Sequence, residues 1–96
     1  MSKFARRVDD NQGEIVLALR AAGATVRIIT QGDGIPDLLV GYNKHTVLME
    51  VKDGKKVPSA QKLTVAEEKF HREWPGDNLH IVTSVDAALA LLKSCV

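Results

Sequence analysis

Three charged residues, Asp37, Glu50 and Lys52, border two short apolar runs of the chain. The runs cover residues 38–41 and 46–51 and are joined by a polar connection of four residues, a pattern that predicts a β-hairpin. Both runs are apolar on either face, which is typical of strands that are covered on both sides. Charged side chains are costly in such strands unless they are paired or bind a metal ion. These three residues are therefore the first candidates for chemistry.

The register of the predicted hairpin decides whether the two acids meet. If the four connecting residues form the loop, Gly41 faces Thr46, and counting back along the strands sets Asp37 opposite Glu50. Side chains alternate across a strand, so Lys52 shares the face of Glu50. Directly opposed residues have Cβ atoms roughly 4.5–5.5 Å apart, and a slip of one residue would move the carboxylates to opposite faces.

Two adjacent carboxylates repel each other, and a nearby cation relieves the repulsion. Lys52 supplies one positive charge, and a divalent metal would supply the rest. An ordinary ion pair between Glu50 and Lys52 at a strand end explains their spacing equally well. The spacing leaves both interpretations open, although Asp37 at the matching hairpin position strengthens the case for a metal.

Residues around this hairpin resemble the PD-(D/E)XK nuclease motif. The particular residues at the motif positions are similar to those of its VRR-NUC branch, the virus-type replication-repair nucleases, in a stand-alone, phage-like form. The resemblance is carried by Gly34, Pro36 and Asp37, by Glu50, Val51 and Lys52, and by Gln61. It extends from Glu14 to residues 82–84 and so covers most of the chain. The order helix, hairpin, glutamine-bearing helix, strand and helix makes it more specific than the core motif alone.

The resemblance implies a Mg²⁺- or Mn²⁺-dependent endonuclease that hydrolyses phosphodiester bonds in DNA. Asp37, Glu50 and the backbone carbonyl of Val51 would hold the metal, because hard oxygen ligands suit Mg²⁺. Lys52 would orient the attacking water or stabilise charge in the transition state.

Two further site residues follow from the resemblance rather than from spacing. In related nucleases a glutamate of the first helix approaches the metal, which makes Glu14 a third acid and metal ligand. Gln61, at the start of the second helix, would reach the site as a catalytic residue. Spacing alone favours a surface position for both side chains.

The remaining segments predict the elements that must position these residues. They are a helix over about residues 11–22, a strand over 24–30, a helix from 58 onward, a strand over 79–83 and a helix capped by Ser84. With the hairpin, this order is αβββαβα in one domain over residues 1–96. The fold class is therefore α/β, a mixed four-stranded sheet flanked by helices on both faces, and the resemblance implies a restriction-endonuclease-like core.

The second helix is expected to begin at Pro58, with Ser59 as its N-cap. Its apolar stripe would be buried, and it is formed by Leu63, Ala66, Phe70 and Trp74. Since Trp74 continues this stripe, we expect it to be a core residue rather than a platform for stacking bases.

Composition limits the kinds of partner. The net charge is +1, so contact with nucleic acid must come from a local basic patch. Lys55, Lys56 and Lys62 are its candidates, with Arg6 and Arg7 in residues 1–8, which form either a basic arm or a frayed terminus. A single cysteine excludes a disulfide framework, and no apolar stretch approaches membrane-spanning length. We expect a cytoplasmic protein of a bacterium or a phage-infected host cell, with no membrane partner.

One 96-residue domain has room for one such site, whereas resolving a four-way junction needs two nicks related by a two-fold axis. Stand-alone relatives resemble junction resolvases, so we expect a homodimer that acts on branched DNA as a Holliday-junction resolvase. The alternatives are a monomeric flap or single-strand nuclease and a catalytically silent nucleic-acid-binding module on the same fold. A structural protein with a simple network of salt bridges is a further alternative.

Overall fold

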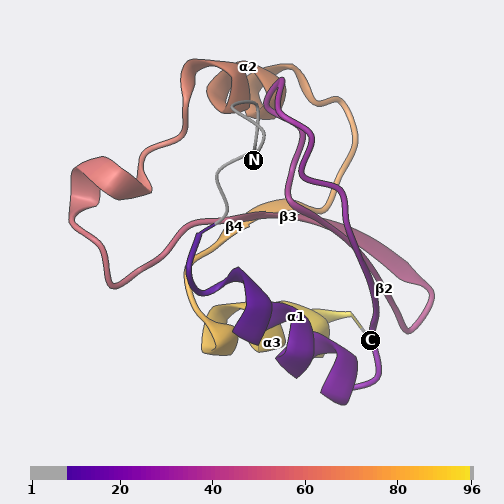
Figure 1. The fold of residues 1–96 in the computed structure, drawn as a ribbon. Helices are drawn as coiled ribbons and strands as arrows, with labels where there is room; N and C mark the ends of the chain where they lie inside the picture. The colour runs from indigo at the N-terminus through magenta and orange to yellow at the C-terminus, as the bar shows by residue number, and fades with distance from the viewer. Residues whose placement is uncertain (1–8, 96) are drawn as a thin grey trace.

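The computed structural model describes residues 9–95 and forms a four-stranded sheet with three α-helices (Figure 1). The elements are α1 (Gln12–Ala21), β1 (Thr25–Ile28), β2 (Leu38–Tyr42), β3 (His45–Val51), the 3₁₀ helix η1 (Pro58–Gln61), α2 (Val65–Glu73), β4 (Leu79–Val82) and α3 (Val85–Ser94). The strands lie in the order β1-β2-β3-β4, antiparallel except for the parallel pair β3 and β4. This arrangement confirms the predicted αβββαβα order and the mixed sheet.

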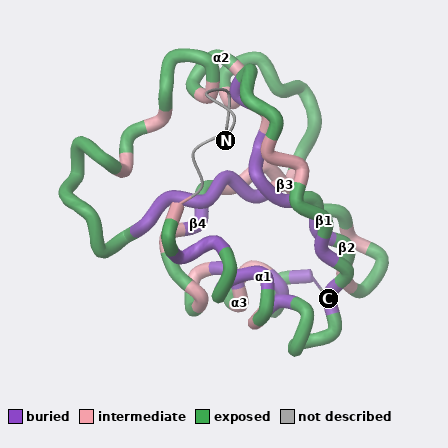
Figure 2. Tube along the Cα trace, viewed as in Figure 1, coloured by how far each residue is buried: buried purple, intermediate pink, exposed green. Residues whose placement is uncertain are grey.

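The apolar core lies between one face of the sheet and helices α1 and α3 (Figures 1 and 2). Val26, Val40 and Val47 pair directly across β1, β2 and β3, and all three are buried. Ile15 and Leu19, one helical turn apart on α1, are fully buried against this layer. Asp37 and Glu50 lie on the opposite face of the sheet, because side chains alternate along each strand.

The hairpin has the predicted register but a tighter turn. Gly41 pairs with Thr46, and Tyr42 and His45 pair as well, which leaves only two residues in the turn. These two, Asn43 and Lys44, have left-handed φ values of 49° and 66°, as the tightest hairpin turns require. The turn therefore begins one residue later than the four-residue loop expected from the sequence, without changing the register.

The second helix begins later than the sequence predicts. Residues 58–61 form only a 3₁₀ turn, and Lys62 is extended at φ −70° and ψ 148°, so Ser59 does not cap an α-helix. Helix α2 instead begins after Thr64, whose side chain accepts a hydrogen bond from the Glu67 N–H, while the Glu67 carboxylate accepts one from the Thr64 N–H. This reciprocal capping box satisfies two free donors at once and outweighs the local signal at Pro58.

The predicted burial of the α2 stripe is also wrong. Within the described chain, α2 contains no buried residue, and Ala66 is exposed. Trp74 is 37% exposed and stacks on Phe70 at a ring-centroid distance of 5.3 Å rather than entering the core. The stripe stays unburied because α2 lies on the side of the sheet away from α1 and α3, where it does not pack as a layer against the core (Figure 1).

Candidate metal and phosphate site

The open end of the hairpin brings Asp37 close to the end of β3. The Oδ2 of Asp37 accepts a hydrogen bond from the Val51 N–H at 2.8 Å, and its Oδ1 accepts one from the Thr30 hydroxyl at 2.9 Å. Both carboxylate oxygens therefore have a donor, although the side chain is buried. The predicted register, carried one step beyond Leu38 and Met49, places Asp37 beside Glu50.

Glu50 is the less satisfied acid of the pair. It is only 2% exposed, its Oε1 atom has no hydrogen-bond partner among residues 9–95, and its Oε2 atom lies 3.8 Å from the Nζ of Lys52. Burial raises the pKa of Glu50 to about 9, and the negative charge of Asp37 adds to the increase. Without a further cation, the folded protein therefore holds Glu50 in its protonated form at neutral pH.

Lys52 has a closer partner that sequence reasoning missed. Its Nζ atom donates a hydrogen bond to the Oε1 of Glu67, on α2, at 2.7 Å. Burial opposes the charge of Lys52, but the hydrogen bond and charge of Glu67 outweigh burial and raise the lysine pKa. Burial likewise opposes the charge of Glu67, yet the bonds from Lys52 and Thr64 lower its pKa overall. The spacing of Thr64 and Glu67, that of a capping box, is the signal that could have found this helix start.

Gly34 allows α2 to approach the site. Its φ is +77°, and a Cβ atom at this position would collide with the backbone carbonyl of Ala66, in the first turn of α2. Only glycine combines this backbone conformation with so close an approach. Gly34 thus permits the close approach of α2 that brings Glu67 within reach of Lys52.

A cavity of about 510 Å³ opens over the acid pair. Its charged lining consists of Asp9, Asp10, Asp37, Glu50, Lys52, Lys56, Lys62 and Glu67. Lys56 lies 3.8 Å from both Asp9 and Asp10, and its side chain is 40% exposed. Burial raises the pKa of Asp9, although the positive charges of Lys52 and Lys56 oppose the increase. Three lysines and several acids thus share one solvent-open space.

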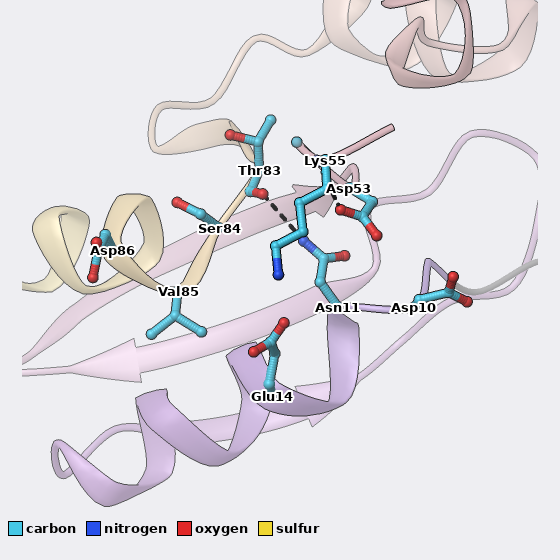
Figure 3. Close-up of a pocket in the computed structure, with 10 residues that line it drawn as sticks. Asp10, Asn11, Glu14, Asp53, Lys55, Thr83, Ser84, Val85 and Asp86 are labelled. Atoms are coloured by element: carbon cyan, nitrogen blue, oxygen red, sulfur yellow. Dashed lines mark hydrogen bonds between the residues drawn. The ribbon is translucent and has the colours of Figure 1, made fainter. Parts of the chain in front are cut away.

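Glu14 does not join this cavity, contrary to its predicted role as a third metal-binding acid. It is exposed and lines a separate cavity of about 660 Å³ (Figure 3). Asn11 contributes to the separation, because its Nδ2 donates to the carbonyls of Lys52 and Thr83 at 3.2 Å and so ties the start of α1 to the ends of β3 and β4. This anchor leaves Glu14, a turn further along α1, facing the second cavity.

Two other predicted residues also lie outside the acid-lined cavity. The Nε2 of Gln61 donates to the carbonyls of Lys56 and Gly54, at 2.6 and 3.4 Å, so Gln61 braces the turn after β3 instead of reaching the acids. Its place in η1 rather than in α2 explains this orientation. Lys55 lines the cavity of Glu14 (Figure 3). Arg6 and Arg7 lie outside the described residues.

The donors over the cavity fit a hard cation better than a soft one. Among residues 9–95, no three His, Cys, Asp or Glu side chains are grouped closely enough to form a metal cage. Asp37 and Glu50 nevertheless place two buried carboxylates side by side, with one oxygen unpaired. Two carboxylates, with the remaining positions left to water and substrate, are the usual protein share for Mg²⁺.

Comparisons with protein-family models, curated proteins and solved structures find no match to this chain. Within residues 9–95, none of the helices has the length and apolar character needed to cross a membrane.

Proposed function

We propose that this chain is a metal-dependent phosphodiesterase that cleaves DNA, of the PD-(D/E)XK type and similar to the VRR-NUC branch. The observation that carries the proposal is the buried carboxylate of Glu50, which lacks a partner for Oε1 and lies beside Asp37 below an open cavity. A fold has no reason to retain such an acid for stability, since an unpaired buried carboxylate is destabilising. A bound cation would give both carboxylates the positively charged partner that they lack.

Asp37, Glu50 and the Val51 carbonyl would hold Mg²⁺ or Mn²⁺. The metal, when bound, supplies positive charge that activates water and offsets the charge growing on the phosphoryl oxygens. Asp37 is already oriented for this task by Thr30 and by the Val51 N–H. The alternative of a plain ion pair between Glu50 and Lys52 fits less well, because Lys52 is closer to Glu67 than to Glu50.

Lys52 is suited to meet the scissile phosphate. Its amine lines the cavity and stays charged, because Glu67 raises its pKa. A cation that is fixed in place before the reaction stabilises transition-state charge without reorganising. Glu67 would act as a positioning residue, holding the amine of Lys52 above the acid pair.

Phosphate groups of a nucleic acid offer the best match to the lysines around the cavity. Lys56 and Lys62 line it beside Lys52. The pairs of Lys56 with Asp9 and Asp10 are long and partly exposed, and such pairs contribute little, so a phosphate can replace them. We further propose that two copies act together on branched DNA, such as a four-way junction, with a monomeric flap or single-strand nuclease as the alternative.

A panel of labelled DNAs tests the function. Four-way junctions, flaps, single strands and duplexes would be incubated with the protein in Mg²⁺, in Mn²⁺ and in chelator. We expect cleavage only with divalent metal, and paired nicks only on the junction. Metal-dependent cleavage restricted to flaps or single strands would support the monomeric alternative. Binding without cleavage of any substrate would indicate a silent binding module and would refute the nuclease.

A further inference from the structure

The two edges of the sheet are protected very differently. Strands β1 and β4 are both edge strands of the sheet formed by residues 9–95, so neither has a neighbouring strand of these residues on its outer side. At β1, the guanidinium of Arg20 donates to the Val26 carbonyl at 2.9 Å, and the exposed side chain of Arg27 adds a charge. Both features obstruct pairing with another strand. Strand β4 contains Leu79, His80, Ile81 and Val82 and has no Lys, Arg, Asp, Glu or Pro.

The outward-facing groups of β4 can be identified from its bonds to β3. The Asn78 carbonyl accepts from the Leu48 N–H at 2.8 Å. The Val82 carbonyl accepts from the Lys52 N–H at 3.0 Å. Because backbone groups alternate in direction along a strand, the N–H and C=O of Leu79 and Ile81 face away from the sheet. The side chain of Ile81 is 46% exposed, which is unusual for a large apolar residue paired with a buried acid.

We propose that β4 pairs antiparallel with β4 of a second copy of this chain, with the two-fold axis at His80. In this register Leu79 lies opposite Ile81 of the second copy, and Ile81 lies opposite Leu79 of the second copy. The four outward N–H groups and four outward carbonyls at these positions then bond one another, as in any hydrogen-bonded antiparallel pair. Each exposed Ile81 gains an apolar cross-strand neighbour, which stabilises sheets.

A second copy fits this edge better than an unrelated strand, because the edge is complementary to itself. An isologous contact requires each residue to find its partner on the same patch of the other copy, and Leu79 and Ile81 meet this condition. The closed sheet would also hide the only unobstructed edge of the described residues from further pairing. The pairing depends only on the backbone and side chains of β4, not on catalysis.

One consequence rests on the proposed function. The axis runs perpendicular to the sheet, so the acid pairs of both copies lie on the same face of the extended sheet. Glu50 lies one strand inside Ile81. Three strand spacings of about 4.8 Å, with an offset of two residues along the strands, separate the two Glu50 Cα atoms by roughly 16 Å. Two phosphodiester strands at a branch point could therefore meet one site each.

A disulfide across the axis tests the pairing. His80 would face its own counterpart as a non-hydrogen-bonded pair, with Cα atoms about 4.5 Å apart, a distance that a disulfide tolerates. His80→Cys should therefore form a covalent dimer on mild oxidation. Arg27→Cys, on the other edge, and the wild type, whose single cysteine Cys95 is buried, should remain monomers on a denaturing gel. Equal crosslinking of all three, or none by His80→Cys, would overturn the proposal.

Sedimentation gives an independent measurement that needs no crosslink. Ile81→Lys should raise the dimer dissociation constant by tenfold or more, whereas Ile28→Lys, at a comparably exposed position on β1, should leave it unchanged. Circular dichroism would confirm that both variants are folded. A wild type that is monomeric at every concentration would overturn the pairing and leave a monomeric nuclease standing. A chain that dimerises through β4 but cleaves no DNA would keep the pairing and remove the proposed function.

Discussion

The two central acids differ in what surrounds each oxygen. Both oxygens of Asp37 accept hydrogen bonds, from Thr30 and from the backbone of Val51. Glu50 has one unpaired oxygen and a lysine at 3.8 Å that is engaged more closely by Glu67. Glu50 is therefore the acid with fewer stabilising partners, and substitutions of Glu50 should show most clearly whether a metal ion occupies the site.

Replacing Glu50 by Gln should stabilise the metal-free protein at alkaline pH. The pKa of Glu50 is near 9 in the folded state and near 4.5 when unfolded, so the folded state holds an extra proton between these values. Stability should therefore fall as pH rises, by at most about 1.4 kcal/mol per pH unit, or about 6–11 °C in melting temperature for a domain of this size. Thermal melts of wild type and Glu50→Gln in chelator, from pH 7 to 8.5, measure the difference.

This window avoids other shifted groups. Burial lowers the pKa of His71, so His71 affects stability below its ordinary pKa of 6.5 and with the opposite sign. Added Mg²⁺ should reverse the ranking, because a ligand that binds only the folded state stabilises it. Identical pH slopes for the two proteins in chelator would contradict the assignment of an unpaired acid at Glu50.

Replacing Lys52 by Ala should separate metal binding from cleavage. The acid pair remains, so Mg²⁺ should still raise the melting temperature, while cleavage should fall by about 10²–10³-fold as a positioned transition-state contact is lost. The control is Lys55→Ala, because Lys55 lies outside the acid-lined cavity. Loss of metal binding in Lys52→Ala, or equal cleavage by the two variants, would place the lysine in a different role.

At the scale of elements, the hairpin was predictable and the second helix was not. Gly41 and Thr46 pair as expected, because the polar connection and the apolar runs fix the register locally. At the second helix, Pro58 and Ser59 carry a local start signal, but the capping box at Thr64 fixes the actual start. The choice between these two local signals depends on where the chain must cross the sheet. The apolar periodicity of the sequence carries no information about that position.

The approach of α2 to the site gives a test at the same scale. Gly34→Ala should push the first turn of α2 away, break the contact between Lys52 and Glu67, and lower the free energy of unfolding by about 1–3 kcal/mol. Gly32→Ala is a matched control: its φ of +78° imposes the same backbone strain, but no atom lies within 4 Å of the added Cβ. Denaturant unfolding measures both.

The difference between the two glycine variants isolates the collision from the strain of a left-handed φ. Cleavage should also fall further in Gly34→Ala than in Gly32→Ala, since Lys52 loses its positioning residue. If both variants lose the same stability and activity, the distance of α2 from the hairpin does not matter for the site.

At the scale of the whole molecule, the acid pair could be predicted from the sequence, but the positions of Glu67 and Glu14 relative to it could not. Asp37 and Glu50 meet because hairpin geometry is local. Glu67 lies 15 positions from Lys52 along the chain, and its contact depends on how α2 crosses the sheet. Glu14 was assigned by resemblance, whereas the anchor of Asn11 on the ends of β3 and β4 directs it into a different cavity. Contacts between elements were thus the part that local patterns could not supply.

DNA binding should depend steeply on salt, because a chain of net charge +1 offers only a local cationic patch. Each phosphate neutralised contributes roughly −0.9 to the slope of log K against log salt on duplex DNA. Lys62→Ala should reduce the slope by about one unit, while Lys93→Ala, in the last turn of α3 and away from the cavity, should not. Fluorescence anisotropy in Ca²⁺ over a range of salt measures both slopes. A salt-independent affinity, or strict dependence on one base sequence, would argue against backbone recognition.

Cleavage of a labelled DNA junction by wild type, Asp37→Ala and Glu50→Ala, each in Mg²⁺ and in chelator, tests the central claim most directly. The buried acid pair is proposed to hold the metal on which hydrolysis depends, so only wild type in Mg²⁺ should cleave. Both variants should remain folded by circular dichroism. Glu50→Ala removes a buried acid that has an unpaired oxygen, and Asp37→Ala costs only the hydrogen bonds from Thr30 and the Val51 N–H. Cleavage by wild type in chelator, or undiminished metal-dependent cleavage by both variants, would contradict the account.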